Sequence, residues 1–202
     1  VKAHEGGDIH IHDMDFYTLT MTCCQIDLVK LLKGGFSTGH GHLREPNDIE
    51  SYAALACIAI QSNQNDQHGG QSVPNFDYSM AMGVRKTFQR IYRQNLARAV
   101  MLLEDRTDPE SEIKANIQKI KEETGLYPKL EDCEEYFQAE MPFLLAHYNQ
   151  DEAEMRKCQA FAHYRATKET DRATYQAMEA LIHNLNTMHS RAGAQTPFSS
   201  IN

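Results

Sequence analysis

The segment HEGGDIHIHDMDFYTLTMTCCQIDL, residues 4–28, carries the strongest strand pattern in the chain. Residues 8–12 alternate polar and apolar side chains, and the FYTLTMT run that follows is rich in aromatic and β-branched residues. Both features are typical of a β-strand. We therefore expect a strand near residues 8–22, which ends just before the adjacent cysteines Cys23 and Cys24.

The histidines of this strand have three open interpretations. Side chains alternate along a strand, so His10 and His12 would project from the same face. They could bind a metal together with Asp13, Cys23 or His40, because zinc takes nitrogen, sulfur and oxygen ligands. They could equally form a hydrogen-bonded polar face in the core, or contact a substrate. The substrate-binding role is favoured, and no metal site is assigned.

The cysteines indicate a reduced protein. Adjacent residues of a strand face opposite sides, so Cys23 and Cys24 are too close in sequence for an ordinary two-cysteine redox motif. By spacing alone, a buried and unreactive thiol is the favoured fate of either residue. The chain holds an odd number of cysteines, five in all, which is not the pattern of a disulfide framework. A cytoplasmic location follows as an expectation.

Most of the remaining chain is predicted to be helical. Apolar residues at helical spacing predict a helix over about 48–65, and a second, longer helix is expected to begin near Pro74. The charged residues 106–130 suggest a short helix between surface loops. For residues 131–163 we expect helical pieces interrupted by Pro142, without a clear topology.

A last long helix and a final strand complete the pattern. The helix carries an apolar stripe at positions i, i+3, i+4, i+7 and i+10, formed by Met178, Leu181, Ile182, Leu185 and Met188. An apolar, β-prone run then predicts a strand near residues 195–202. Two strands around a helical excursion over 48–190 would leave unpaired edges, which complete domains rarely tolerate. We therefore expect residues 1–202 to form a single partial domain.

Two polar stretches could bind anions. The stretch NQNDQHGGQS, residues 63–72, leads amide side chains into a double glycine whose backbone donors could hold a phosphate. It lacks the lysine of a P-loop, and a polar helix terminus is favoured. Residues 83–98 are locally basic, which by default indicates a solvated helix face. The alternative is a nucleoside triphosphate site, in which arginines would bind phosphate and Tyr92 would stack on a base.

Composition narrows the range of partners. The formal net charge is −8 and the isoelectric point is about 5.7, so a nucleic-acid backbone is not an expected ligand. No apolar run approaches the roughly 18 residues of a membrane span, and no leader pattern opens the sequence. The sequence starts at Val1 without a methionine. We expect it to be a piece of a longer protein, without membrane or nucleic-acid partners.

Five motifs occur in the order found in one enzyme family. They are HEGGDIHIHDMDFY, TCCQIDL, GGF, HGGQS and NTMHSRAGAQTPFSSIN. Together they resemble the anaerobic, class III, ribonucleoside-triphosphate reductases, with the weakest match between about 105 and 170. The resemblance implies a mainly α fragment with a few β-strands. It would be the truncated first part of a ten-stranded α/β barrel of the glycyl radical enzymes.

The resemblance also implies roles for individual residues. Cys23 aligns with a barrel cysteine close to the substrate ribose, which works with formate, the reductant. His10 and His12 align with histidines that line the substrate pocket. Thr22 stands where the family often has asparagine, and is expected to face the substrate as well. The implied reaction makes deoxyribonucleoside triphosphates by glycyl and thiyl radical chemistry.

The remaining implied features concern regulation and assembly. The helices flanking HGGQS would pair two subunits into a homodimer and hold a deoxynucleoside triphosphate or ATP effector, with contacts from Gln61 and Arg90. The glycyl radical, a structural zinc site and an ATP-binding cone would lie outside this chain, and a radical-SAM enzyme would activate the full-length protein. The isolated fragment is expected to be inactive. The alternative function is an effector-binding dimerisation module without catalysis.

Overall fold

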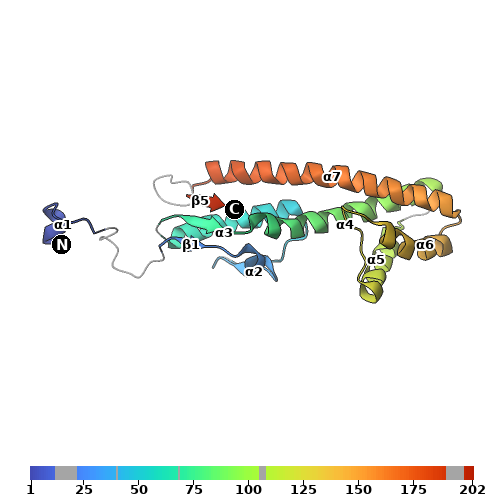
Figure 1. The fold of residues 1–202 in the computed structure, drawn as a ribbon, viewed down its shortest axis with the longest axis horizontal. Coiled ribbons are helices and arrows are strands. Elements are labelled where there is room, and N and C mark those ends of the chain that lie inside the picture. The colour runs from blue at the N-terminus through green and yellow to red at the C-terminus, as the bar shows by residue number, and fades with distance from the viewer. Residues whose placement is uncertain (12–21, 40, 68, 105–107, 190–197) are drawn as a thin grey trace.

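The structure is a computed structural model that describes residues 1–11, 22–39, 41–67, 69–104, 108–189 and 198–202. It is mainly helical, as the sequence predicts (Figure 1). The helices are α1 (Lys2–Glu5), α2 (Leu28–Leu32), α3 (Ile49–Asp66), α4 (Phe76–Leu103), α5 (Glu110–Thr124), α6 (Glu134–His147) and α7 (Glu152–Thr187). The strands are β1 (Cys24–Gln25), β2 (Phe36–Ser37), β3 (His42–Leu43), β4 (Gln71–Val73) and β5 (Ser199–Ile201).

Three short parallel strands form a sheet in the order β1-β4-β5. Parallel strands need a crossover connection, which is usually helical. Here α3 lies in the crossover from β1 to β4, and α4 to α7 lie in the crossover from β4 to β5. The backbone pairing is direct, because Gln71 N donates to Phe198 O at 3.0 Å and Ile26 N donates to Ser72 O at 2.8 Å. Strands with helical crossovers are the arrangement from which α/β barrels are built, but closure into a barrel stays a prediction.

The strands differ in part from the sequence-based prediction. The strand expected near residues 8–22 lies mostly at 12–21, outside the described residues, and its described parts, residues 8–11 and Thr22, are not in a strand. The strand expected near 195–202 is confirmed as β5. The central strand β4 was not predicted. It is only three residues long between Gly70 and Pro74, too short for a recognisable alternation.

The long helices α4 and α7 hold two hydrophobic cores together. They pack side by side over much of their length, and α3 packs against both (Figure 1). One core joins α4 and the first half of α7 to α5 and α6, around Phe88, Tyr136 and Leu144. The other joins the start of α4 and the end of α7 to α2, α3 and β4, around Ile60 and Val73. Both cores are completed by side chains from segments far apart in the sequence.

Helix boundaries follow local chemistry. Asp48 Oδ1 accepts a hydrogen bond from Ser51 N at 2.8 Å, and Asp151 Oδ1 accepts one from Glu154 N at 2.9 Å, which caps α3 and α7. The helix α5 ends at Gly125, which has a left-handed conformation with φ of 75°. In contrast to the prediction, α6 continues through Pro142. Pro142 is exposed, so water can reach the backbone at this point.

The predicted apolar stripe of α7 is confirmed only in part. Leu181 is buried, and Met178 and Leu185 pack against the second core. Ile182 and Met188 are exposed, and Met188 follows the last residue of α7. Among the described residues, no helix has both the length and the apolar composition needed to cross a bilayer.

Candidate functional site

The two adjacent cysteines lie at the start of β1 and face different surroundings. Cys24 belongs to β1 and is half-buried against α3. Asn63 Nδ2 donates to Cys24 Sγ at 3.0 Å and to Gln71 Oε1 at 2.8 Å. Gln71 Nε2 in turn donates to Ile60 O at 2.8 Å. The side of the sheet that Cys24 faces is therefore closed by a fixed amide network between β1, β4 and α3.

Cys23 is exposed and packs against the double glycine. A Cβ built on Gly69 would lie 2.9 Å from Cys23 Sγ, so the thiol occupies the space that a side chain would fill. Gly69 also has φ of +103°, a conformation that favours glycine. The expectation of a buried thiol is wrong for Cys23, which precedes β1 and is exposed. Cys24 is half-buried and contacts the helix layer.

The start of β5 completes this edge of the sheet. A Cβ on Gly70 would lie 3.0 Å from the ring of Phe198, and Cys24 N donates to Gly70 O at 3.2 Å. Residues 23, 70 and 198 each directly precede one of the three parallel strands. The three segments thus meet at the edge of the sheet where its strands begin. Figure 1 shows β1, α3 and β5 at the same end of the helical bundle.

The remaining thiols have a different chemical character. Cys57, Cys133 and Cys158 are buried, and burial raises the pKa of each above its usual value. A thiol with a raised pKa is less often present as the reactive thiolate. The exposed Cys23 is therefore the thiol best placed to meet a ligand.

A cavity of about 560 Å³ lies next to Cys24, between β1, α3 and the β2 segment. Its polar lining carries no charged group and consists of Cys24, Gln25, Ser37, Thr38, Ser62, Asn63 and Asn65. The run of amides at 63–72 is visible in the sequence, but the groups that these side chains contact are not. The contacts of Asn63 and Gly69 are with Cys24 and Cys23, which lie far away in the sequence.

Of the residues predicted to bind substrate, His10 lies away from Cys23. It is exposed and its ring lies 5.3 Å from that of His4, next to α1, which Figure 1 shows well apart from the sheet. Thr22 is exposed and is the sequence neighbour of Cys23. His12 lies outside the described residues.

The proposed effector residues Gln61 and Arg90 lie apart within one chain. Arg90 lies close enough to Asp48 for its charge to help lower the pKa of that carboxyl. Burial works against this shift, but hydrogen bonds from Ser51 and the charges of Arg90 and Arg44 together outweigh it. Gln61 lies on α3, roughly 20 Å from Asp48 along the axis of that helix. These two residues therefore do not form one small site within a single chain.

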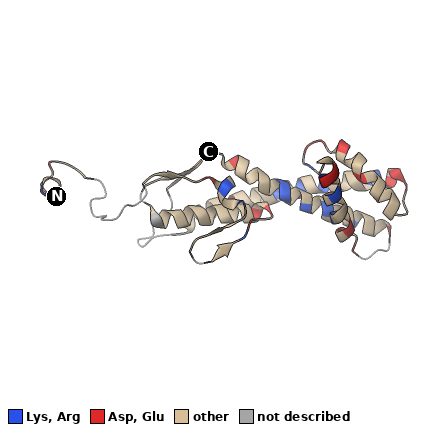
Figure 2. Cartoon of the chain, turned by 90° about the horizontal axis from the view of Figure 1, so that it is seen from below, with Lys and Arg blue, Asp and Glu red and all other residues tan. Residues whose placement is uncertain are grey.

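The basic stretch of α4 is largely engaged in structural contacts. Lys86 Nζ lies 2.6 Å from Glu45 Oε1, and this hydrogen bond lowers the pKa of Glu45. Arg93 Nε lies 2.9 Å from Glu110 Oε1. Figure 2 shows basic residues in the middle of the bundle and many acidic residues towards the end that holds α5 and α6. Tyr92 is fully buried, so the interpretation that its ring stacks on a base is wrong.

The stretch at residues 63–72 contains a polar helix terminus, as the sequence favoured. Residues 63–66 form the last turn of α3, which ends at Asp66, and Gly69 and Gly70 lead into the central strand β4. Within the described ranges, no three histidine, cysteine, aspartate or glutamate side chains gather closely enough to hold a metal ion.

Comparison with known proteins points to one enzyme family. Residues 1–202 match the family described as anaerobic ribonucleoside-triphosphate reductase. The chain is 33% identical over 92 residues to the anaerobic ribonucleoside-triphosphate reductase of Enterobacteria phage T4, and 29% identical over 133 residues to that of Escherichia coli K12. It is 30% identical over 92 residues to that of Salmonella typhimurium LT2.

These alignments cover part of this chain and a smaller part of each relative. They include 45% of this chain for the phage and Salmonella proteins and 65% for the E. coli protein. They span only 15%, 18% and 13% of the phage, E. coli and Salmonella proteins, respectively. The matched region is thus a small part of a much longer enzyme.

Proposed function

Because the chain belongs to the anaerobic ribonucleoside-triphosphate reductase family, we propose that it forms the first part of the catalytic barrel, with Cys23 as the thiol that meets the ribose. The observation that carries this proposal is the position of Cys23. Its thiol is exposed at the sheet edge, while its neighbour Cys24 is held towards α3 by Asn63. In a barrel with helices outside, the side away from the helices is the interior.

The proposed reaction replaces the 2′-hydroxyl of a ribonucleoside triphosphate with hydrogen. A glycyl radical elsewhere in the full-length protein would supply the thiyl that removes the ribose 3′ hydrogen. The 3′-hydroxyl gives up its proton and the 2′-hydroxyl leaves as water. The role proposed for Cys23 is to deliver a hydrogen atom to the ribose radical, and the Cys23 thiyl that results would take the hydrogen atom of formate. The second electron of formate, together with a proton, would reduce the 3′-ketone as carbon dioxide leaves, and the first thiol would return a hydrogen atom to C3′.

The local structure supports this role for Cys23. Hydrogen-atom donation needs a neutral thiol close to the substrate, and does not require the low pKa of a nucleophile. The missing side chain at Gly69 leaves room for the thiol, and Thr22 is exposed directly before it. Because of both features, the Cys23 thiol lies at an accessible, polar position at this edge of the sheet.

A pair of matched variants tests the proposal in the full-length protein. Cys23→Ser should abolish deoxynucleotide formation and leave effector binding intact, because serine does not donate a hydrogen atom as a thiol does. Cys24→Ser is the control, because its oxygen still accepts the Asn63 hydrogen bond and turnover should persist. Deoxynucleotide production is measured by chromatography of the products. Turnover by Cys23→Ser would show that another residue is the donor.

The second candidate function is effector binding without catalysis. Two observations favour it: Gln61 Nε2 and Arg90 Nε are buried and have no hydrogen-bond partner among the described residues. Buried polar groups are normally paired, so a ligand or a second copy could satisfy them. Titration calorimetry with dATP or dTTP tests this function. Heat of binding that is lost in Gln61→Ala and Arg90→Ala supports it, and the absence of heat refutes it.

A further inference from the structure

A cavity of about 780 Å³ lies between α4, α7 and the segment 125–133, which joins α5 to α6. We call it the interhelical cavity. Its apolar wall is shared by the two cores, because Phe88 belongs to the first core and Phe76 and Met80 belong to the second. Mostly apolar cavities of this size, with a few polar groups in fixed positions, are typical of small-molecule sites.

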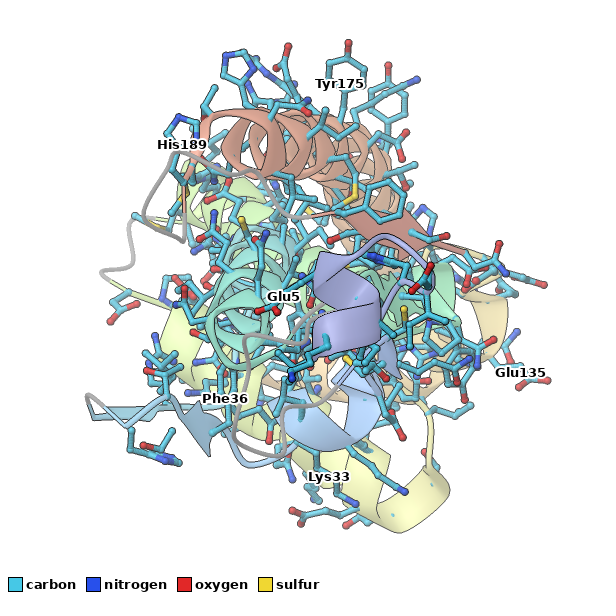
Figure 3. The ribbon with its side chains drawn as sticks, turned by 90° about the vertical axis from the view of Figure 1, so that its left-hand side faces the viewer. Glu5, Lys33, Phe36, Glu135, Tyr175 and His189 are labelled. Atoms are coloured by element: carbon cyan, nitrogen blue, oxygen red, sulfur yellow. The ribbon has the colours of Figure 1, made fainter. Side chains whose placement is uncertain are left out.

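Helix α7 forms one side of this cavity. Thr174 and Met178, one turn apart, line it, whereas the ring of Tyr175 points away from the other elements (Figure 3). Thr174 Oγ1 is buried and has no hydrogen-bond partner in the described structure. A buried hydroxyl is normally paired, so a polar atom of a bound ligand would satisfy Thr174.

Three basic side chains converge on one aromatic ring in the wall of the cavity. The centroid of the Tyr127 ring lies 6.0 Å from Arg85 Cζ, 5.9 Å from Lys121 Nζ and 5.3 Å from Lys129 Nζ. We call these three basic residues the cation cluster, and two of them, Arg85 and Lys129, also line the cavity. The ring attracts each cation, but the three like charges repel one another. A bound anion would relieve this repulsion.

The cation cluster makes no ion pair with any carboxylate in the part of the chain that the structure describes. Two other basic residues of α4 are paired, Lys86 with Glu45 and Arg93 with Glu110. The chain is acidic, with a net charge of −8, so carboxylates are plentiful. Three cations that share a ring but no carboxylate leave a local positive charge, which can attract an anion.

The main chain of Lys129 is held in place by two elements. Lys129 N donates to Cys133 Sγ at 3.1 Å, and Lys129 O lies 3.0 Å from His163 Nε2 of α7. The ring of His163 in turn packs edge-on against that of Phe88 on α4, with 5.4 Å between the centroids. The segment 125–133 contains no helix or strand, but these contacts fix Lys129 relative to both long helices. A site whose binding groups are already in place loses less entropy when a ligand binds.

Carboxylates in the wall limit the negative charge that the cavity can accept. Asp77, Glu131 and Asp132 also line it and are exposed. They would repel a polyphosphate, whereas a single negative charge can lie at the cation cluster alone. The apolar wall favours a hydrocarbon body on the same ligand. The cavity is also separate from Arg90, whose charge acts on Asp48.

We propose that the interhelical cavity binds a small organic monocarboxylate with an apolar body, of the size of a medium-chain fatty acid. Its carboxylate lies at the cation cluster, where Arg85 and Lys129 can both reach it, and its hydrocarbon covers Phe76 and Met80. Because side chains of both cores line the cavity, the bound ligand holds the two cores together. This site does not depend on the reductase activity proposed above.

Equilibrium dialysis of the full-length protein with radiolabelled octanoate tests the proposal. Octanoate should bind saturably, at one site per chain. Octan-1-ol has the same hydrocarbon without the charge, and acetate has the charge without the hydrocarbon. Each should compete at least tenfold more weakly than unlabelled octanoate, because it keeps only half of the recognition. The absence of saturable binding, or equal competition by octan-1-ol, would refute the proposal.

Charge variants test whether the cation cluster holds the carboxylate. Lys129→Gln and Arg85→Gln should each raise the dissociation constant of octanoate roughly tenfold, because each removes one cation from the site. Lys119→Gln is the matched control. Lys119 lies on α5, its Nζ is 4.0 Å from Glu123 Oε1, and it does not line the interhelical cavity. The loss of one positive charge there should leave the dissociation constant unchanged.

A cavity-filling variant tests the apolar part of the site. Ala81 lines the cavity and is exposed, so a larger side chain can enter the cavity without displacing a core residue. Ala81→Trp should abolish octanoate binding, while circular dichroism shows unchanged helix content. Full binding by Ala81→Trp, or equal dissociation constants for Lys129→Gln and Lys119→Gln, would place octanoate elsewhere on the protein and overturn the proposal.

Discussion

At Gly69, two separate constraints exclude a side chain. The backbone has φ of +103°, and a Cβ would meet Cys23 Sγ at 2.9 Å. We expect Gly69→Ala to lower the free energy of unfolding by roughly 1–3 kcal/mol, because alanine is strained at positive φ. It should also displace the Cys23 thiol and change its rate of alkylation by iodoacetamide, followed by mass spectrometry.

Gly125→Ala is the matched control for this prediction. Gly125 also has a positive φ, of 75°, but nothing lies within 4 Å of its Cβ position. This variant should lose stability without a change in Cys23 alkylation. Equal alkylation rates in Gly69→Ala and the wild type would show that the thiol does not depend on the glycine.

The surroundings of single residues were poorly predictable from the sequence. Cys23 precedes β1 and is exposed, although its spacing favoured a buried thiol. The partner of Cys24 was not predictable, because Asn63 reaches it from α3 only after the crossover has folded back. His10 was expected in a strand, but residues 8–11 are not in a strand, and the ring of His10 lies near that of His4.

Among the elements, α6 is fixed by a buried carboxyl. Glu140 is fully buried and accepts hydrogen bonds from Tyr92 and Tyr136, each at 2.7 Å, and from Gln159 at 2.9 Å. Burial raises the pKa of Glu140, although these three hydrogen bonds act in the opposite direction. The folded protein therefore binds a proton here that the unfolded chain releases near its ordinary pKa of 4.5.

This proton makes stability depend on pH in a defined direction. Because the folded pKa is raised, the stabilisation is complete below pH 4.5 and is lost as the pH rises through the folded pKa. Glu140→Gln mimics the neutral acid, so its urea-unfolding free energy should fall less between pH 5 and pH 9 than that of the wild type, in a range set by this pKa. Parallel curves for the two proteins would contradict the prediction.

Helices and strands were predicted well where their pattern of apolar residues extends over many residues. The helix expected over 48–65 is Ile49–Asp66 in the structure, because many helical repeats and the Asp48 cap define it. The strand β4 was missed, because a strand of three residues receives its stability from β1 and β5 rather than from its own sequence. The continuity of α6 through Pro142 was also missed, because a proline usually interrupts a helix.

For the whole molecule, the two cores predict two regions of separate stability. Ile60 is fully buried in the core that supports the sheet, and Leu144 is fully buried in the core formed with α5 and α6. Either Ile60→Ala or Leu144→Ala should cost about 2–5 kcal/mol. Native-state hydrogen exchange should show faster exchange of the Cys24 amide in the first variant and of the Tyr148 amide in the second.

Each of these variants is the control for the other. The same acceleration of both amides in both variants would mean that α4 and α7 couple the cores into one cooperative unit. The division of the molecule into two cores was not predictable from sequence. Both α4 and α7 contribute to both cores, so the sequence of either helix alone does not show where one core ends and the other begins.

The pairing of β4 with β5 has a consequence for how the chain folds. Gln71 and Ser199 are paired neighbours in the sheet although most of the chain separates them. Closing so large a loop is slow, whereas the contacts between successive helices are comparatively local. The helices should therefore assemble first and the sheet last. The edge at which Cys23 meets Gly69 would then be among the last parts of the chain to take shape, on a helical scaffold that is already complete.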